Sequence, residues 1–403
     1  MLLRMLFILL CFGSLFGEIV LGVDAFFETA VFELKDKKVG LIVNQTSVDS
    51  KMRSTLSRFQ DAGIRIAALF APEHGLKGRQ YAAEKVADEK ESAIPIYSLH
   101  GDKRRPNREM LAGLDAIVYD IQCTGVRAYT YQTTLYYVME EAAKAGIEVI
   151  VLDRPNPING LVVDGPMLQD KWRSFIGYIN VPYCPGMTIG ELARFFNAEY
   201  KVGCKLTVIP MKGWKRKMSY RDTGLAWIPP SPNVPEPDTP LFCPITGILG
   251  ELNLVNIGIG YTMPFKLVGA PWIKAEEFAA ALNHQKLPGV RFQPYHFRPF
   301  YGLFKGLDCE GVLIHITDEK IFRPLSTQYL IVGLLKSLYP SEFTKRMEQI
   351  GSRKDLFCKA NGTDAIYDIL CKEKYPAWKL IDFQKKEREA FLEKRKLYLL
   401  GYE

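Results

Sequence analysis

Polar and charged side chains follow each of five short apolar segments, at the points where strands are expected to end. Turn chemistry explains part of this pattern, because Asn, Asp, Gly and Pro dominate turns for local reasons. It does not explain why carboxylates, amides, imidazoles and a guanidinium recur at one strand end after another. Together they predict a polar crevice that suits a hydroxyl-rich, anionic ligand. The five groups are Asn44-Gln45-Thr46, Glu73-His74-Gly75, His100-Gly101-Asp102, Asp120-Ile121-Gln122 and Asp153-Arg154-Pro155-Asn156-Pro157, with Arg127, Tyr129 and Tyr131 after the fourth.

Several familiar kinds of site are disfavoured by their motifs. The first expected strand runs into Asn44-Gln45-Thr46 rather than a glycine-rich turn, and Gly258-Ile259-Gly260 lies late and lacks the third glycine of a dinucleotide fingerprint. The chain has neither a GxSxG elbow nor an HExxH zinc helix. Its cysteines are widely and irregularly spaced, without a CxxC pair. We therefore expect no metal ion and no cofactor.

Alternating strands and helices are expected to position the polar groups. Continuous apolar strands separated by helices are typical of a parallel sheet that is covered on both faces. The fold class predicted is α/β, with a Rossmann-like, doubly wound parallel sheet at the N-terminal end. Ligands of such sheets bind at the carboxyl ends of the strands. Strands are predicted over residues 39–44, 64–70, 94–99, 116–121 and 147–153, and helices over 52–62, 133–145 and 189–200.

A proline-rich stretch divides the chain. At 403 residues the chain is long enough for two packed domains. Residues 228–244 contain seven prolines, a density that cannot continue a helix or a central strand. We place a Rossmann-like catalytic domain over 18–240 and a smaller α/β domain that completes the cleft over 241–403. Beyond the boundary we predict strands over 289–294 and 311–317, and helices over 275–284, 327–338 and 383–397.

The first 17 residues have the pattern of a secretory signal peptide. Arg4 gives a positive start, and an uncharged apolar run from Met5 to Phe16 ends at the small residue Gly17. The run is too short to cross a bilayer, although a buried first helix is an alternative. We expect an exported protein, periplasmic or secreted, without a membrane span after cleavage. The short, interrupted basic clusters make nucleic acid an unexpected partner.

A set of longer motifs resembles the NamZ-type exo-β-N-acetylmuramidases, a glycoside hydrolase family. The resemblance extends from Ile19 to the end of the chain. It implies a Rossmann-like domain, a smaller C-terminal α/β domain and a site in the cleft between them. It also implies release of N-acetylmuramic acid from the non-reducing ends of peptidoglycan-derived muramyl saccharides, without a metal. The motifs are Gly40-Leu-Ile-Val-Asn-Gln-Thr46, Ala71-Pro-Glu-His-Gly75, Asp120-Ile-Gln122, Gly125-Val-Arg127, Tyr129-Thr-Tyr131, Val151-Leu-Asp-Arg-Pro-Asn-Pro157, Gly186-Met-Thr-Ile-Gly-Glu-Leu-Ala193, Ser231-Pro-Asn233 and Pro264-Phe265.

The chain departs from the family pattern in three places. Cys123 stands where the family commonly has Asp, and Pro185 where it commonly has His. The family run Ser-Glu-Gly-Arg-Gly-Thr is Asn-Ile-Gly-Ile-Gly-Tyr over residues 256–261. The last departure removes two charges from an expected cleft loop. We expect these departures to affect substrate preference and activity.

Glycosidic cleavage usually needs an acid for the leaving oxygen and a second carboxylate that attacks or activates water. Glu73 is the predicted acid/base, because partial burial at a crevice mouth could raise its pKa toward the working pH; the alternative is a turn cap. His74 could hold or tune it. Asp120 and Asp153 are both candidates for the second carboxylate. Glu191 matches a family motif, but Thr188-x-x-Glu191 is also a capping box.

The lactyl carboxylate of N-acetylmuramic acid favours a bidentate arginine. Arg127 and Arg154 are the candidates, and the alternative for each is a structural pair with Asp120 or Asp153. Tyr129, Tyr131 and Trp227 could pack on the pyranose ring, although aromatic residues are more often core. The amides predicted to bind substrate are Asn44, Gln45, Gln122, Asn156 and Asn233. A non-catalytic wall-sugar binding protein on the same fold stays open as the second interpretation.

Overall fold

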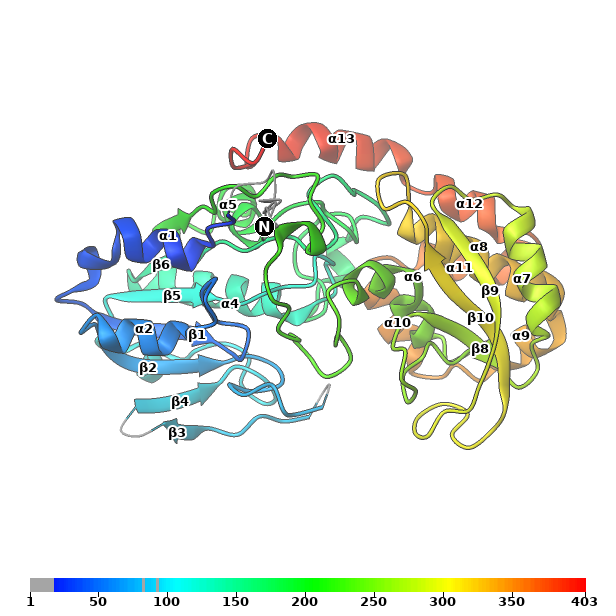
Figure 1. Ribbon diagram of the computed structural model, residues 1–403, viewed down its shortest axis with the longest axis horizontal. Coiled ribbons are helices and arrows are strands. Elements are labelled where there is room, and N and C mark those ends of the chain that lie inside the picture. Colours follow the sequence, from blue (N-terminus) through cyan, green and yellow to red (C-terminus); the bar gives the residue numbers. More distant parts are fainter. Residues whose placement is uncertain (1–17, 82–83, 92–93) are drawn as a thin grey trace, which may run out of the picture.

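The computed structural model of the protein describes residues 18–81, 84–91 and 94–403. The predicted signal peptide, residues 1–17, lies outside the described residues. Figure 1 shows two units side by side, a larger one that contains a parallel sheet and a smaller one that contains a short antiparallel sheet. Within the described part of the chain, none of the helices combines the length and the apolar character needed to cross a bilayer.

The larger unit contains a seven-stranded sheet in the order β3-β4-β2-β1-β5-β6-β7. Strand β3 pairs antiparallel with β4 at one edge, and the other six strands are parallel. Read without β3, this is the strand order of doubly wound nucleotide-binding folds, whose topological switch point lies here between β1 and β5. The predicted fold class is therefore confirmed. The strands are β1 (Lys38–Val43), β2 (Arg65–Ala71), β3 (Glu89–Glu91), β4 (Ile94–Ser98), β5 (Ala116–Asp120), β6 (Glu148–Leu152) and β7 (Leu206–Ile209).

Helices cover both faces of this sheet. Alternate residues of each strand point to opposite faces, so Val118 packs with Phe26 and Phe59 while Ile117 packs with Leu135 and Phe196. All residues of β5 are buried for this reason. The covering helices are α1 (Gly22–Thr29), α2 (Thr55–Asp61), α3 (Arg108–Leu111), α4 (Thr130–Ala145) and α5 (Ile189–Glu199), with 3-10 turns at Val31–Leu34, Asp170–Trp172 and Arg221–Thr223.

The smaller unit begins inside the proline-rich stretch. Helix α6 (Thr239–Glu251) contains Pro240 in its first turn, where a missing N–H is harmless, and also Pro244 in its interior. The expectation that proline density excludes a helix up to residue 244 is therefore wrong from Thr239 onward. The sheet order is β8-β10-β9. The other elements are β8 (Leu267–Ala270), α7 (Ala275–His284), β9 (Val290–Phe297), β10 (Cys309–Ile316), α8 (Pro324–Leu338), α9 (Pro340–Glu348), α10 (Arg353–Asn361), α11 (Ala365–Lys372) and α12 (Pro376–Asp382).

The last helix returns to the larger unit. Helix α13 (Lys385–Arg395), red in Figure 1, leads the chain back across the molecule to the region near α5. Phe391 joins the core beneath α4 and α5, and Tyr402 joins the core on the other face of the sheet. The C-terminal residues, which the sequence analysis grouped with the second domain, thus pack on the first.

Candidate active site

The Glu73 carboxylate lies where three elements of the larger unit meet. Glu73 follows the end of β2, His100 follows β4, and Thr130 opens α4. The Thr130 hydroxyl donates a hydrogen bond to Glu73 Oε2 at 2.6 Å, and His100 Nε2 lies 3.8 Å from Glu73 Oε1. The Glu73 side chain keeps 12% of its surface exposed, so it is sheltered but reachable. For these residues, the predicted convergence of strand-end groups is found in the structure.

The two histidines near Glu73 differ in their surroundings. His74 adopts a left-handed backbone conformation with φ of 70°, and its Nδ1 lies 2.8 Å from the Gln80 carbonyl oxygen. Burial lowers the pKa of His100, against the opposing influence of the Glu73 carboxylate, so we expect a neutral imidazole at neutral pH. From the sequence, His100 was expected at the polar crevice but without a specific role in binding or catalysis. Its position directly after a strand was the available signal.

The proline-rich segment crosses the carboxyl ends of the strands. The Gln45 amide nitrogen donates to the carbonyl oxygens of Pro229 and Pro230, at 2.8 and 3.1 Å. The Tyr131 hydroxyl donates to the same Pro230 oxygen at 2.5 Å. Trp227 is used locally, since its indole N–H donates to the Val234 carbonyl oxygen. Gln45 and Tyr131 therefore anchor this segment, which runs between the two units in Figure 1.

A cavity of about 420 Å³ lies in the smaller unit just beyond this anchor, and we call it the Asn233 pocket. Only Ser231 and Pro232 lie between Pro230 and Asn233, which limits the distance between the Cα atoms of Pro230 and Asn233 to about 10 Å. Asn233 thus connects the pocket to the segment that Gln45 and Tyr131 anchor, and the volume of the pocket suits a monosaccharide. Its lining consists of Asn233, Gly247, Gly250, Glu251, Asn253, Val255, Asn256, Ile257, Ile259, Phe265, Leu303 and Arg353.

Asp120 and Arg154 form a buried ion pair with each other. Arg154 Nε and Nη2 donate to the two oxygens of Asp120, at 2.5 and 2.9 Å, and the Thr55 hydroxyl also donates to Asp120 Oδ2. Arg154 Nη2 further donates to the Val48 carbonyl oxygen. This is the structural pairing that the sequence analysis kept as the alternative. The predicted catalytic role of Asp120 and binding role of Arg154 would both require this pair to open.

Asp153 lies fully buried at the end of β6, among hydrogen-bond donors of the protein itself. Its Oδ2 accepts from the hydroxyls of Thr188 and Tyr402, and its Oδ1 accepts from the Gly190 N–H. Burial raises the pKa of Asp153 to about 7, despite these donors, and the nearby Glu191 charge acts in the same direction. The predicted role as second carboxylate would require Asp153 to leave a position with no exposed surface.

The raised pKa of Asp153 predicts a pH-dependent stability. The ordinary pKa of an aspartate is 3.8, so the unfolded chain releases the Asp153 proton near pH 4. The folded state holds this proton up to about pH 7. This contribution is present below that window and is lost as the pH rises through it, by at most a few kcal/mol, since one pKa unit is worth about 1.4 kcal/mol. Between pH 4.5 and 7.5, the free energy of unfolding in urea should therefore fall more, or rise less, for the wild type than for Asp153→Asn. Equal differences would contradict the assignment.

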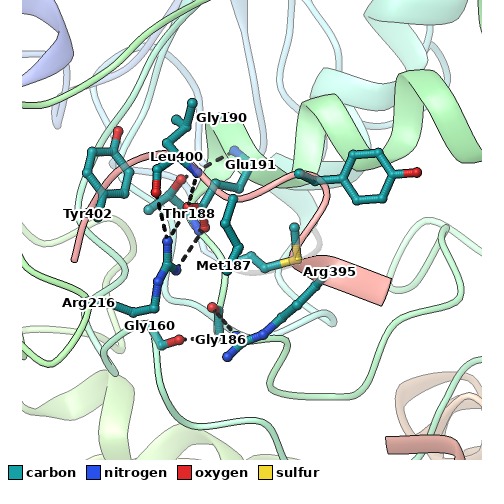
Figure 2. A network of polar contacts seen from close by, with 12 residues as sticks. Gly160, Gly186, Met187, Thr188, Gly190, Glu191, Arg216, Arg395, Leu400 and Tyr402 are labelled. Carbon is teal, nitrogen blue, oxygen red and sulfur yellow. Dashed lines mark hydrogen bonds and ion pairs between the residues drawn. The ribbon is translucent and has the colours of Figure 1, made fainter. Parts of the chain in front are cut away.

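Glu191 acts as the predicted helix cap and also holds the C-terminal tail (Figure 2). Thr188 and Glu191 form the capping box at the start of α5. Glu191 Oε1 also accepts from Arg216 Nη2 at 2.6 Å and from the Leu400 N–H at 2.9 Å. Arg395 donates to the carbonyl oxygens of Gly160 and Gly186 close by. The structural interpretation of Glu191 is confirmed.

Arg127 is buried between the two units. Its Nη1 donates to the carbonyl oxygens of Pro166 and Val181, at 2.7 and 2.6 Å. Its Nη2 donates to those of Ala360 and Asn361, at 3.1 and 2.6 Å, at the end of α10. With four carbonyl partners, the guanidinium has a structural position, and the predicted lactyl contact would require it to give some of them up.

The remaining predicted binding residues mostly shape the loops around the site. Asn44 Oδ1 accepts from the Thr46 N–H and hydroxyl. Gln122 Nε2 donates to two carbonyl oxygens, while its buried Oε1 has no hydrogen-bond partner in the part of the chain that the structure describes. Asn156 donates to the Met187 carbonyl oxygen and accepts from the Ile158 N–H. The Tyr129 ring packs edge-on against Tyr131, with centroids 4.7 Å apart. Among the described residues, no cluster of three or more His, Cys, Asp or Glu side chains has an arrangement suited to a metal ion.

Comparison with known proteins gives matches along nearly the whole described chain. The family models for the N-terminal and C-terminal parts of exo-beta-N-acetylmuramidase NamZ match residues 39–238 and 241–401. A peptidoglycan beta-N-acetylmuramidase NamZ of Bacillus subtilis is 40% identical over 326 residues, which cover 80% of this chain and 78% of that protein.

Two solved structures of DUF1343 family proteins from Bacteroides fragilis are similar to the whole molecule. The first has a TM-score of 0.89 and 38% sequence identity, and the second has 0.75 and 26%. Each similarity covers 95% of this chain and 99% of the solved chain. The arrangement of both units is therefore shared with these proteins.

Proposed function

The chain belongs to the exo-β-N-acetylmuramidase NamZ family, and from this premise we propose that it releases N-acetylmuramic acid from the non-reducing ends of peptidoglycan fragments. The observation that carries the proposal is the position of Glu73. Its sheltered, partly exposed carboxylate is oriented by Thr130 and lies beside His100. A polar strand-end site, linked through residues 230–233 to a pocket of monosaccharide size in the smaller unit, suits a sugar with an ionisable substituent.

In the proposed mechanism, Glu73 protonates the glycosidic oxygen as the bond to the anomeric carbon breaks. The oxygen of a water molecule ends up bonded to that carbon, and a proton from the water returns to Glu73. The hydrogen bond from Thr130 fixes the plane of the Glu73 carboxyl group. His100 is neutral and therefore brings no positive charge next to this carboxyl group. Asp120 and Asp153 take no part in this proposal, because both are fully buried. Some hydrolases of N-acetylated sugars use the substrate's own acetamido group in place of the second carboxylate. One protein carboxyl group at the site is compatible with that route.

Export of the protein is part of the proposal and rests on the sequence of residues 1–17 alone. The positive Arg4, the apolar run that follows and Gly17 favour cleavage near this point. The enzyme would then meet its substrate outside the cytoplasm, in the periplasm or in the medium. Mass spectrometry of the mature N-terminus tests this, and a protein that retains Met1 and Arg4 in the cell interior would contradict it.

A non-catalytic binding protein is the second candidate, and the departures from the family pattern favour it. Cys123 stands at the position of a common family Asp, and burial raises the pKa of its thiol to about 12, so it carries no charge there. Ile257 and Ile259 replace two charged family residues and line the Asn233 pocket. These losses leave Glu73 and its partners untouched.

Turnover of defined substrates separates the two candidates. The wild type should release N-acetylmuramic acid from a chromogenic N-acetylmuramic acid glycoside and from the non-reducing end of a muramyl disaccharide. An oligosaccharide capped at that end by N-acetylglucosamine should resist cleavage, because the proposed action is exo. Tight binding of the disaccharide without any released sugar would contradict the proposed enzyme and support the non-catalytic binding protein. Cleavage inside the capped chain would contradict the exo mode.

A further inference from the structure

The lactyl carboxylate of the proposed substrate needs a cationic partner that the buried arginines do not readily supply. The two terminal nitrogens of Arg127 donate hydrogen bonds to four carbonyl oxygens, and Arg154 forms an ion pair with Asp120. Neither guanidinium has more than a few per cent of its surface exposed. A ligand anion would have to displace these contacts in order to reach them.

Among the described residues that line the Asn233 pocket, Arg353 is the single cation. It is the first residue of α10, and 43% of its side chain is exposed. The amides of Asn233 and Asn253 belong to the same lining, and the Phe265 ring adds an apolar surface. Beside the Glu251 carboxylate that orients Arg353, the pocket thus offers one guanidinium, neutral hydrogen-bonding groups and apolar contact, which match the parts of an N-acetylated sugar acid.

Glu251 holds Arg353 without using all of its donors. Arg353 Nε donates to the Glu251 backbone carbonyl oxygen at 3.1 Å, and Nη2 lies 3.5 Å from Glu251 Oε2, at the limit of a hydrogen bond. A guanidinium has five N–H donors in a rigid fork, so most remain for a ligand. Burial raises the pKa of Glu251 even though Arg353 opposes this, which indicates a weak pairing. The side chain is oriented, but not neutralised as in a close bidentate pair.

The loop at residues 256–261 departs from the family pattern, and this departure makes Arg353 more important as a cation of the pocket. Ile257 and Ile259 occupy the positions where the family commonly has Glu and Arg, and both line the pocket. Asn256 holds the loop in shape, because its side chain bonds the Ile259 and Leu303 carbonyl oxygens and the Gly258 N–H. The pocket of this chain therefore has no second arginine at that loop to share the recognition of an anion.

We propose that Arg353, oriented by Glu251, binds the lactyl carboxylate of N-acetylmuramic acid in the Asn233 pocket and sets the preference for this sugar over N-acetylglucosamine. The proposal rests on the proposed function and specifies its sugar recognition. A contact of this kind is made equally in the ground state and the transition state, so its loss raises KM and leaves kcat nearly unchanged.

The test compares the nitrophenyl glycosides of N-acetylmuramic acid and N-acetylglucosamine in matched variants. Arg353→Ala should raise KM for the first glycoside about 10- to 100-fold, the value of a charged hydrogen-bonded contact, and leave the second unaffected. Arg353→Lys should give an intermediate KM, because an ammonium keeps the charge but not the fork. Lys359→Ala is the control, since it removes a positive charge from the same helix at a residue paired with Asp355 outside the pocket lining.

Direct binding keeps this test separate from the question of catalysis. Calorimetric titration with free N-acetylmuramic acid and free N-acetylglucosamine should show the same dependence on Arg353 in the wild type and in Glu73→Gln. If the protein binds N-acetylmuramic acid selectively through Arg353 but shows no turnover, the proposed enzymatic activity is contradicted and the proposed binding site is retained. A wild type that binds or cleaves both sugars alike, or an Arg353→Ala variant with unchanged sugar preference, overturns the proposal.

Discussion

Replacing Glu73 with glutamine is expected to lower kcat for a muramyl disaccharide by about 100- to 10,000-fold, the usual contribution of a general acid. Glutamine has nearly the same shape and can still accept the Thr130 hydrogen bond, but it has no acidic proton to donate. Binding of N-acetylmuramic acid should therefore be retained, and the loss should fall on kcat. Steady-state release of the free sugar, followed by chromatography, measures it.

The leaving group supplies a second measure of the same prediction. A nitrophenolate leaves without much help from an acid, so the loss in Glu73→Gln should be smaller for the nitrophenyl glycoside than for the disaccharide. Glu84→Gln is the matched control, because Glu84 is exposed in the loop after β2 and accepts the Tyr81 N–H at 3.0 Å. Retention of more than about a tenth of the wild-type kcat on the disaccharide would exclude Glu73 as the acid.

Arg127→Met is expected to destabilise the protein by roughly 3–5 kcal/mol, because each buried acceptor left without its donor costs about 1–3 kcal/mol. The substitution leaves four carbonyl oxygens without their donor, two in the larger unit and two at the end of α10. Although burial lowers the pKa of Arg127 to about 10, its charge is present at neutral pH. Urea unfolding at pH 7 measures the loss.

An exposed arginine provides the control for this substitution. Arg53 pairs with Asp61 at 2.8 Å, and 54% of its side chain is exposed, so Arg53→Met should change the free energy of unfolding by less than about 0.5 kcal/mol. The structural role of Arg127 also predicts an unchanged preference between the two sugars in the folded variant. A change below about 1 kcal/mol, together with a higher KM for N-acetylmuramic acid glycosides alone, would favour the lactyl contact instead.

The central sheet was predictable because its signals are local. Each strand of a covered parallel sheet is a continuous apolar run, and β1, β2, β4, β5 and β6 were all expected close to their observed bounds. Strand β7 was missed, because all four of its residues are only half-buried at the end of the sheet. Helix α6 was missed because two prolines within it weigh against a helix in any local analysis.

Position along a strand was enough to predict Glu73 as the acid, but not to choose the second carboxylate. Glu73, Asp120 and Asp153 all lie at the ends of strands, and both aspartates were candidates for that second role. Burial separates them, since Glu73 keeps 12% of its side chain exposed while the two aspartates have no exposed surface. That burial comes from partners far along the chain, such as Thr55 for Asp120 and Tyr402 for Asp153.

By itself, the sequence determined the α/β class, the strand ends that carry polar groups and the capping box of Glu191, because each depends on neighbours a few residues apart. Only the tertiary structure decided which charges are available to a ligand. Arg127 and Arg353 are the same residue type, yet the first is enclosed by carbonyl oxygens up to 234 positions away and the second borders a cavity. The donors left to a guanidinium depend on the groups that folding brings around it, and those groups are not near it in the chain.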